Sequence, residues 1–254
     1  MDRSLIYRNL KINKYKLMKR ISSALIILSF LSCNTLQLNQ DVSVTTKRAV
    51  ELGSIGKVKG VIENSVQINS FPTYQKKIRV AIQVVSFNKS SLKRYNRAAK
   101  HQKGAVKLVL KDSLLPSYKY VNLKLLDKVQ LLNQLNGPHN KSVKTYLQNA
   151  QDDAIVVGIS SYFDQQTMNS LLQADEVYLI NNKPQKYSLE LVKAGKAFEI
   201  LDVSKAVTFA FTTASFCWKK EQGNYNIVNI VEGQEHCEKN TYSHVNRFPK
   251  EKKW

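Results

Sequence analysis

The amino-acid sequence predicts an α+β fold, with a mainly antiparallel sheet in the C-terminal half and several short helices. Three observations lead to this prediction. Segments rich in β-branched residues recur along the chain, apolar residues at helical spacing occupy only short stretches between them, and strands and turns alternate closely in the last third. The longest apolar runs after residue 33 cover residues 154–159 and 206–210, and this length is typical of a buried strand.

The first part of the predicted fold contains two strands. A polar tether, residues 33–55, is expected to come first, with a short helix over residues 43–52. Valine and isoleucine among polar neighbours predict a strand over residues 57–68, which ends before Pro72. Residues 77–87 (KIRVAIQVVSF) are rich in β-branched side chains and predict the second strand.

Residues 88–103 (NKSSLKRYNRAAKHQK) predict a surface helix. An asparagine or serine at its start can cap the first turn, and Gly104 can end it. Leu92, Tyr95 and Ala99 follow one another at helical spacing and form a narrow apolar stripe. The stripe is wide enough to pack against the body of the protein and too narrow for a helix that inserts into a membrane.

Short strands and short helices alternate in the middle of the chain. Strands are predicted over residues 105–110, 119–125, 154–159 and 176–180. Helices are predicted over residues 126–135, 142–149 and 165–173. The sequence Asn-Gly-Pro at 136–138 ends the first of these helices.

The last third begins with a predicted β-hairpin over residues 187–200. If the hairpin is centred on Ala-Gly at 194–195, Leu191 lies opposite Phe198, and Ile200 extends the same apolar face. Ala-Gly is not a preferred two-residue turn, so a register shifted by one residue is the alternative.

Residues 18–33 (MKRISSALIILSFLSC) have the layout of a secretory signal. Two basic residues precede an apolar run of 11 residues, 21–31, which is shorter than the roughly 18–20 residues that span a bilayer. Ser32 then precedes Cys33. With a cysteine at the cleavage position, this stretch resembles a bacterial lipoprotein signal. The resemblance implies cleavage before Cys33, a diacylglycerol on its sulfur, and acylation of its new amino group with a fatty acid such as palmitate.

The lipoprotein resemblance organises the chain into three expected parts: a signal peptide over 1–32, lipidated Cys33 with its tether, and one α+β domain over 56–254 with a sub-boundary near 183–186. Translation starting at Met18 is an alternative to a start at residue 1. A transmembrane anchor and an ordinary secretory signal are the alternatives to lipidation. The expected location is the bacterial cell envelope, in the outer membrane facing the periplasm.

Lipidation of Cys33 leaves two further cysteines, Cys217 and Cys237. A pair in an exported chain is most simply a disulfide, and zinc-ligand spacing is lacking. Strands predicted over residues 206–218 and 225–231 would put Cys237 two strands from Cys217 in a simple meander, about 10 Å away. A disulfide needs Cα atoms within roughly 7 Å. The segment around Cys237 is therefore expected to return beside the strand that holds Cys217, or to cross over it.

Positive charge is concentrated in one segment. Without residues 1–32 the chain keeps 32 basic and 18 acidic residues, a net charge of +14. Residues 76–111 contain 11 Lys and Arg residues, and residues 64–111 contain no Asp or Glu. The predicted helix carries cations that follow one another at three- and four-residue steps or flank that row: Lys89, Lys93, Arg94, Arg97, Lys100 and Lys103.

Like charges at these spacings repel one another on a helix, so an anionic partner would offset a real cost. In the envelope, anionic lipid, lipopolysaccharide or an acidic protein partner fits this charge. Nucleic acid fits the charge but not the compartment, and we expect none. The alternative is a solvated basic face on a lysine-rich protein.

The sequence contains no strong catalytic, metal or cofactor motif, and no cofactor is expected. The histidines, His101, His139, His236 and His244, lack metal-ligand spacing. Ser160 and Ser161 follow Gly158 after a predicted buried strand, but the second glycine of a nucleophile elbow is missing. The acidic candidates are Asp152, Asp153, Asp164, Asp175 and Glu176.

We therefore expect a non-enzymatic, lipid-anchored envelope protein that binds an anionic surface or a protein partner. The alternative is a lipid-anchored envelope hydrolase or small-ligand receptor, with its site near Asp152 and Asp164. A pocket with converging polar groups would favour the alternative.

Overall fold

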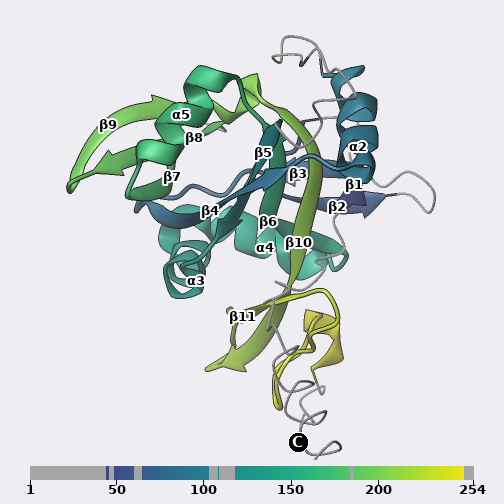
Figure 1. The fold of residues 1–254 in the computed structure, drawn as a ribbon. Coiled ribbons are helices and arrows are strands. Elements are labelled where there is room, and N and C mark those ends of the chain that lie inside the picture. The colour runs from purple at the N-terminus through teal and green to yellow at the C-terminus, as the bar shows by residue number, and fades with distance from the viewer. Residues whose placement is uncertain are drawn as a thin grey trace, which may run out of the picture. The chain divides into compact units, whose positions relative to one another are not determined.

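An 11-stranded sheet organises the fold, and every strand pair in it is antiparallel (Figure 1). The computed structural model describes residues 44–45, 49–59, 65–102, 108, 118–183 and 186–248. Residues 41–254 form one compact unit by their contacts. The α+β class is thus confirmed, with the sheet as its larger part, and antiparallel pairing extends well beyond the C-terminal half.

The strands follow the path β1-β10-β6-β5-β4-β7-β8-β9. β11 pairs with β10, β2 pairs with β6, and β3 pairs with β2. The strand bounds are β1 (Val44–Thr45), β2 (Ile55–Lys59), β3 (Ser65–Ser70), β4 (Ile78–Ser86), β5 (Lys119–Leu125), β6 (Asp153–Tyr162), β7 (Glu176–Lys183), β8 (Lys186–Lys193), β9 (Lys196–Leu201), β10 (Val207–Glu221) and β11 (Asn224–Glu232).

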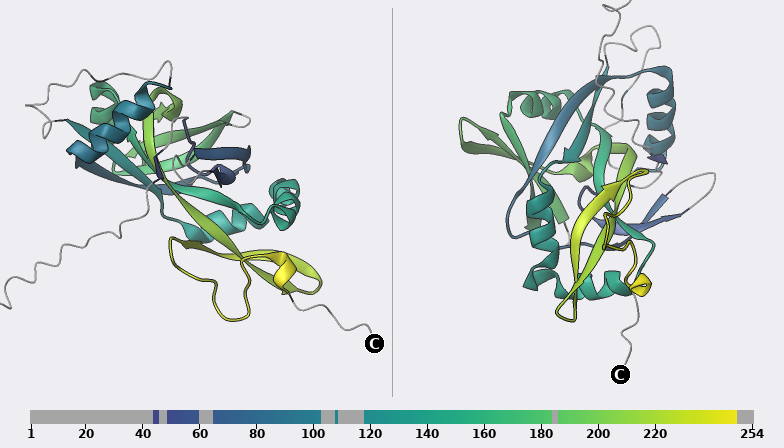
Figure 2. Two further views of the ribbon diagram at one scale, coloured as in Figure 1. Left: turned by 90° about the vertical axis from the view of Figure 1, so that its right-hand side faces the viewer. Right: turned by 90° about the horizontal axis from the view of Figure 1, so that it is seen from below.

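Four α-helices lie within the described residues, and Figure 2 shows them from two further sides. They are α2 (Lys89–Ala99), α3 (Lys128–Asn136), α4 (Lys141–Asn149) and α5 (Gln165–Gln173). Short 3₁₀ helices are also present at Pro138–Asn140, Val203–Lys205 and Val245–Arg247. No helix in the described residues is long and apolar enough to cross a bilayer.

The sheet separates two apolar clusters, and β5 shows why. Val121 and Leu123 are buried in the larger cluster, which also takes in α3, α4 and α5. Tyr120, one residue away, packs against the smaller cluster, which includes the buried residues of α2. Successive side chains of a strand point to opposite faces. Helix α2 therefore covers one face of the sheet, and the other three helices pack on the opposite face.

Local sequence signals predicted most of these elements. β5 and α5 have the predicted bounds, and α3, α4, β6, β7, β10 and β11 differ from the predictions by a few residues at their ends. The helix predicted over residues 43–52 is wrong for the described part of that range, because Val44–Thr45 is a strand paired with β10 and residues 49–52 are not helical. Val50 and Leu52 are buried in the larger cluster, so the folded unit begins before residue 56.

The single strand predicted over residues 57–68 is in fact parts of two strands. β2 and β3 pair antiparallel, with Val58 opposite Val66. Both valines belong to the alternating pattern that predicted one strand. An alternating pattern gives the period of the backbone but not a reversal of its direction, so the sequence could not separate one strand from two.

The β8–β9 hairpin has the predicted turn and a different register. Lys193 lies opposite Lys196 across the turn, but Leu191 lies opposite Glu199, with a bulge between the two pairs. The predicted pairing of Leu191 with Phe198 is therefore wrong, because the bulge leaves one extra residue on β9. As a result Phe198 and Ile200 are exposed at 44% and 53% instead of forming a buried face.

The predicted disulfide is confirmed. Cys217 on β10 and Cys237 are bonded, with Cα atoms 5.5 Å apart and a sequence separation of 20. After the bond the chain returns beside β10, where Trp218 and Tyr242 exchange both backbone hydrogen bonds, at 2.8 and 2.9 Å. This is the return beside the strand that the distance argument required.

Several predictions lie outside the described residues. They are the signal peptide over 1–32, the start at Met18, the lipidation of Cys33, most of the tether, Lys103, and the strand over residues 105–110 apart from Leu108. Residues 100–102 are described and are not helical, so the helix predicted over 88–103 ends earlier, at Ala99.

Candidate functional site

The basic helix α2 forms for local reasons. Asn88 precedes the first helical residue, and its side-chain oxygen accepts a hydrogen bond from the backbone N–H of Ser91 at 2.8 Å. The Ser91 hydroxyl in turn accepts from the backbone N–H of Asn88 at 2.9 Å. These two bonds form a capping box, which satisfies donors that an uncapped helix leaves free. The predicted asparagine cap is confirmed.

One side of α2 is buried against aromatic rings. Leu92, Tyr95, Ala98 and Ala99 are buried, so the predicted apolar stripe is confirmed and one alanine wider. Its partners come from three strands, β5, β6 and β10, and from the link between β4 and α2. The rings around the stripe are Phe87, Tyr120, Tyr162 and Phe209, with centroid distances of 4.9 to 6.2 Å within the group. The fold thereby fixes the rotation of α2 about its own axis.

The end of α2 is tied to β10 by a buried side chain. The Gln102 amide donates to the backbone carbonyl of Thr208 at 2.6 Å, and its oxygen accepts from the backbone N–H of Thr208 at 3.0 Å. Gln102 is itself buried. Because this contact joins residues 106 apart in sequence, no local pattern could have revealed it. It holds the C-terminal end of the helix on the sheet.

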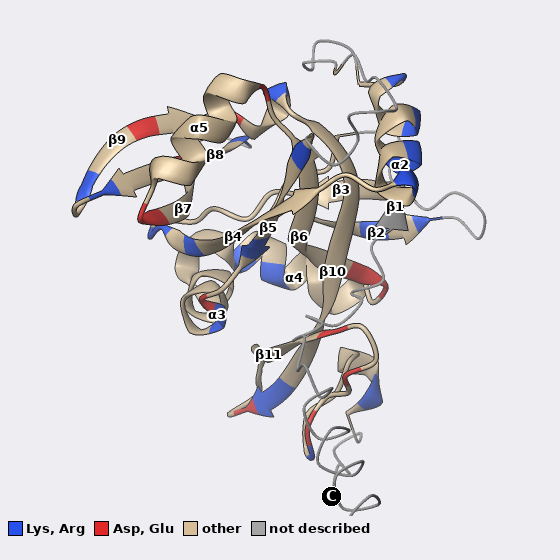
Figure 3. Ribbon diagram, in the orientation of Figure 1, with Lys and Arg blue, Asp and Glu red and all other residues tan. Residues whose placement is uncertain are grey.

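With the apolar side fixed on the sheet, the cations of α2 lie on its solvent-exposed side. Figure 3 shows how closely Lys and Arg follow one another along this helix. The side chains of Lys89, Lys93, Arg97 and Lys100 are exposed, and Arg94 is half-buried. None of the four exposed cations forms an ion pair with any residue that the structure describes. The structure therefore brings the predicted row together as one surface, which we call the α2 basic face (Lys89, Lys93, Arg97, Lys100).

No acidic side chain within α2 offsets the positive charge of the α2 basic face. The first turn of α2 contains no acidic residue, although the partial positive charge of a helix N-terminus favours one there. Lys89 instead adds a positive charge at that end. The α2 basic face therefore attracts anions through its cationic side chains and through the partial positive charge of the helix N-terminus.

The acidic candidates, in contrast, each have a hydrogen-bond or ion-pair partner within the protein. Lys57 donates to Asp152 at 2.6 Å and holds the pKa of that carboxyl below its usual value. Asp164 caps α5, where the backbone N–H of Thr167 lowers the carboxyl pKa. Asp153 accepts hydrogen bonds from Tyr146 at 2.8 Å and from Asn69 at 2.9 Å. Asp175 accepts from the backbone N–H of the turn residue Ala194 at 2.7 Å. Glu176 forms an ion pair with Arg79 at 3.4 Å. These contacts do not bring the five carboxyl groups together.

The serines after Gly158 also have structural partners. Both serines lie inside strand β6. A nucleophile elbow needs its serine on a tight turn after a strand, so neither serine has that geometry. Ser160 donates to Asn122 at 2.7 Å, and the hydroxyl groups of Ser161 and Thr208 lie 2.9 Å apart. Neither serine contacts a histidine in these hydrogen bonds.

No cluster of three potential metal ligands occurs among the residues that the structure describes. His244 comes closest to a site, because its Nδ1 is buried without a hydrogen-bond partner in the described part of the chain. It lines a cavity of about 130 Å³ together with Asp153 and Trp218. Since Asp153 is already bonded to Tyr146 and Asn69, the cavity offers one imidazole nitrogen and no free charge.

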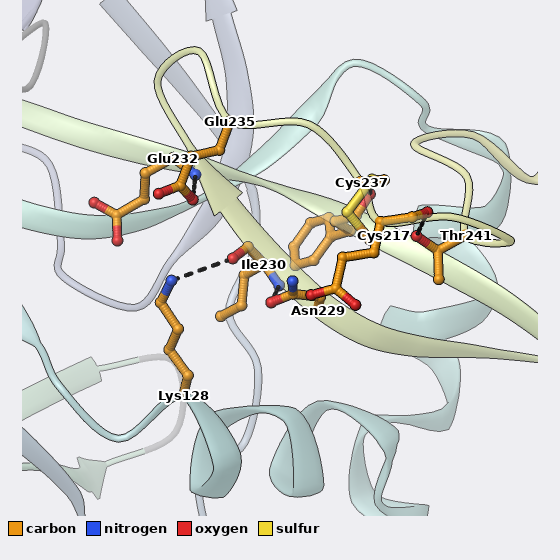
Figure 4. The surroundings of a disulfide bond; sticks show 10 residues. Lys128, Cys217, Asn229, Ile230, Glu232, Glu235, Cys237 and Thr241 are labelled. Carbon is orange, nitrogen blue, oxygen red and sulfur yellow. Dashed lines mark hydrogen bonds between the residues drawn. A yellow bond between two sulfur atoms is a disulfide. The ribbon is translucent and has the colours of Figure 1, made fainter.

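A larger cavity of about 550 Å³ is lined in part by Cys237 of the disulfide. Figure 4 shows the side chains around this bond. The cavity is lined by polar groups of β10, β11 and the segment after them, among them Glu232, Glu235 and Arg247. Glu232 forms an ion pair with Lys124 at 2.7 Å, and Glu235 accepts from the backbone of Glu232 at 3.3 Å. The acids on its wall are thus engaged with the protein, and their arrangement selects no ligand chemistry.

Comparison of the chain with protein-family models, with curated proteins and with solved structures found no match.

Proposed function

We propose that this chain is a non-enzymatic, lipid-anchored protein of the bacterial cell envelope that binds a phosphate-rich anionic surface through the α2 basic face. The lipid on Cys33 supplies the location, in the outer membrane facing the periplasm, and α2 supplies the contact. The surface is that of anionic phospholipid head groups or of lipopolysaccharide, which share phosphate as the recognised group.

The observation that carries the proposal is the orientation of α2. Its apolar side packs against the aromatic rings of the sheet. The other side carries four exposed cations that have no ion-pair partner among the described residues. A helix oriented in this way meets an anionic surface by charge alone, at about 1 kcal/mol for each Lys or Arg held near it. It lacks a second apolar face that could enter the hydrocarbon layer.

Reversing the charge of the face tests the proposal. We expect Lys93→Glu, Arg97→Glu and Lys100→Glu together to weaken binding to phosphatidylglycerol-containing vesicles at least tenfold, about 1.4 kcal/mol. The three side chains are exposed, and glutamate is a good helix former, so the fold is expected to stay intact. The chain also carries Cys33→Ala, so that the lipid does not mask the contact. Vesicle co-sedimentation measures the affinity, and lipopolysaccharide in a parallel arm separates the two sources of phosphate.

A matched control changes the net charge equally at other places. Lys141, Lys183 and Lys239 are exposed and lie outside α2, and their reversal to glutamate is expected to weaken vesicle binding by less than about threefold. Equal losses in both triple variants would mean that net charge, and not the α2 basic face, drives binding, and would refute the site.

The anchor has its own test. Cells fed an alkyne fatty acid are expected to label the wild-type chain and not the Cys33→Ala variant, which should also leave the membrane fraction. A label that survives Cys33→Ala would refute lipidation at this residue. The outcome is independent of the vesicle experiment, which is done without the lipid.

A further inference from the structure

The larger cavity gathers hydroxyl groups from two parts of the chain. Its volume of about 550 Å³ lies within the usual range of small-ligand pockets. The hydroxyls come from β10 and from the segment that returns beside it: Thr212, Thr213 and Ser215 from the strand, Thr241 and Ser243 from the segment. Helix α2 packs on an earlier part of β10, residues 207–210, so this cavity and the α2 basic face are different surfaces.

Most of the polar groups on the cavity wall are not used by the fold. The Thr241 hydroxyl donates to the backbone carbonyl of Glu238 at 2.7 Å. The other four hydroxyls form no hydrogen bond with any described residue: Thr212, Thr213, Ser215 and Ser243. Arg247 is exposed, and it forms no ion pair within the described part of the chain. An apolar ligand would remove water from these groups without replacing their hydrogen bonds, so the wall favours a polar ligand.

The charges on the cavity wall balance. Glu232 is paired with Lys124 at 2.7 Å. Among the other lining side chains Glu235 is negative and Arg247 is positive, with His236 counted as neutral at pH 7. A strongly charged ligand of either sign therefore gains little net attraction from this wall. The wall suits a ligand that is polar and uncharged.

We propose that this cavity binds an uncharged saccharide. A sugar hydroxyl both donates and accepts hydrogen bonds, as the hydroxyls of serine and threonine do, so the two sets can pair with each other. Arg247 adds donors, and the carboxylate of Glu235 adds acceptors. The site goes beyond the proposed function and does not depend on it. It also differs from the ligand site suggested by the sequence, because neither Asp152 nor Asp164 lines this cavity.

The two walls of the cavity are held together before a ligand arrives. Cys237 lines the cavity and is bonded to Cys217 of β10. Tyr242 also lines it, and exchanges two backbone hydrogen bonds with Trp218 of β10. These bonds fix the returning segment beside the strand. Groups that are already in place cost less to order when a ligand binds.

Titration with oligosaccharides tests the site. The probes are the uncharged trimers of glucose and of N-acetylglucosamine, with the trimer of galacturonic acid as an anionic counterpart. We expect at least one uncharged trimer to shift the amide NMR signals of Thr213, Ser215 and Ser243 in the chain carrying Cys33→Ala. Its affinity is expected to be at least about tenfold higher than that of the anionic trimer. No shift of these signals by either uncharged trimer at about 10 mM, or higher affinity for the anionic trimer, overturns the proposal.

Substitutions locate the binding. Arg247→Ala is expected to weaken it at least about tenfold, because hydrogen bonds from a charged donor are the stronger ones. Thr213→Val replaces the hydroxyl by a methyl group and is expected to weaken it about threefold. Arg79→Ala is the control, since it removes a guanidinium of β4 that does not line the cavity. Equal losses for Arg247→Ala and Arg79→Ala, or no loss for either cavity variant, overturn the assignment. Circular dichroism of each variant confirms that the fold is retained.

Discussion

Replacing both Cys217 and Cys237 by alanine is expected to lower the free energy of unfolding by about 3 kcal/mol, the value that the chain-entropy model gives for a loop of roughly 20 residues. The bond closes a loop of that size between β10 and the segment that returns beside it. Without it, the unfolded chain gains conformations that the native chain must lose. Urea denaturation followed by tryptophan fluorescence measures the change, since Trp218 adjoins the bond in sequence and pairs with Tyr242.

Cys33→Ala is the control for this prediction. Residue 33 precedes the folded unit over residues 41–254, so its substitution should leave the free energy of unfolding unchanged. A double-alanine variant as stable as the parent would show that the returning segment is held by its hydrogen bonds alone.

Phe209→Ala is expected to destabilise the protein by about 3–5 kcal/mol, the usual cost of emptying a buried phenylalanine site. The Phe209 ring is 2% exposed and lies between β10 and α2. Its centroid is 5.0 Å from that of Tyr120 and 5.8 Å from that of Phe87. The cavity would remove much of the surface that orients α2, so limited proteolysis should cut near the helix first.

Phe198→Ala is the matched control, because it removes the same ring from an exposed position. We expect it to change the free energy of unfolding by less than about 0.5 kcal/mol. Equal effects of the two substitutions would show that the aromatic cluster does not hold α2 on the sheet.

Local signals predicted α2 well, and physical reasons explain why. The cap by Asn88 and the spacing of Leu92, Tyr95 and Ala99 all lie within one helix, so the sequence contains the full information. The exposed row of cations followed directly from the same spacing. The contacts of α2 with the sheet could not be identified in the same way, because Phe209 and Thr208 of β10 reach the helix region only in the tertiary fold.

Strand register was the part that the sequence could not supply. The bulge at Phe198 shifts the pairing of β9 with β8 by one residue. The alternation of apolar and polar residues does not show where such a shift occurs, so it could not predict the register. The roles of the acidic residues were hidden for a similar reason. Asp152 is bonded to Lys57, which is 95 residues away in sequence, and Asp175 to the turn at Ala194. Long-range pairing decides whether a carboxylate is free for chemistry or engaged with the fold.

The disulfide was predictable by a different route. The sequence predicts export, and in an exported chain two remaining cysteines are expected to pair. Together with the spacing of neighbouring strands, that pairing required the segment around Cys237 to return toward β10. That requirement is geometric, and the structure meets it with a Cα–Cα distance of 5.5 Å.

We propose that, apart from the lipid on Cys33, charge on the α2 basic face is what binds the protein to anionic head groups. The most direct measurement is the salt dependence of vesicle affinity for the Cys33→Ala chain, with and without the reversal of Lys93, Arg97 and Lys100. Between about 0.1 M and 1 M salt the Debye length falls from about 10 Å to about 3 Å. We expect the affinity of the unreversed chain to fall steeply over this range, and that of the reversed chain to be weak and nearly flat. Affinity that does not change with salt, or equal salt dependence for the two chains, would refute binding through the α2 basic face.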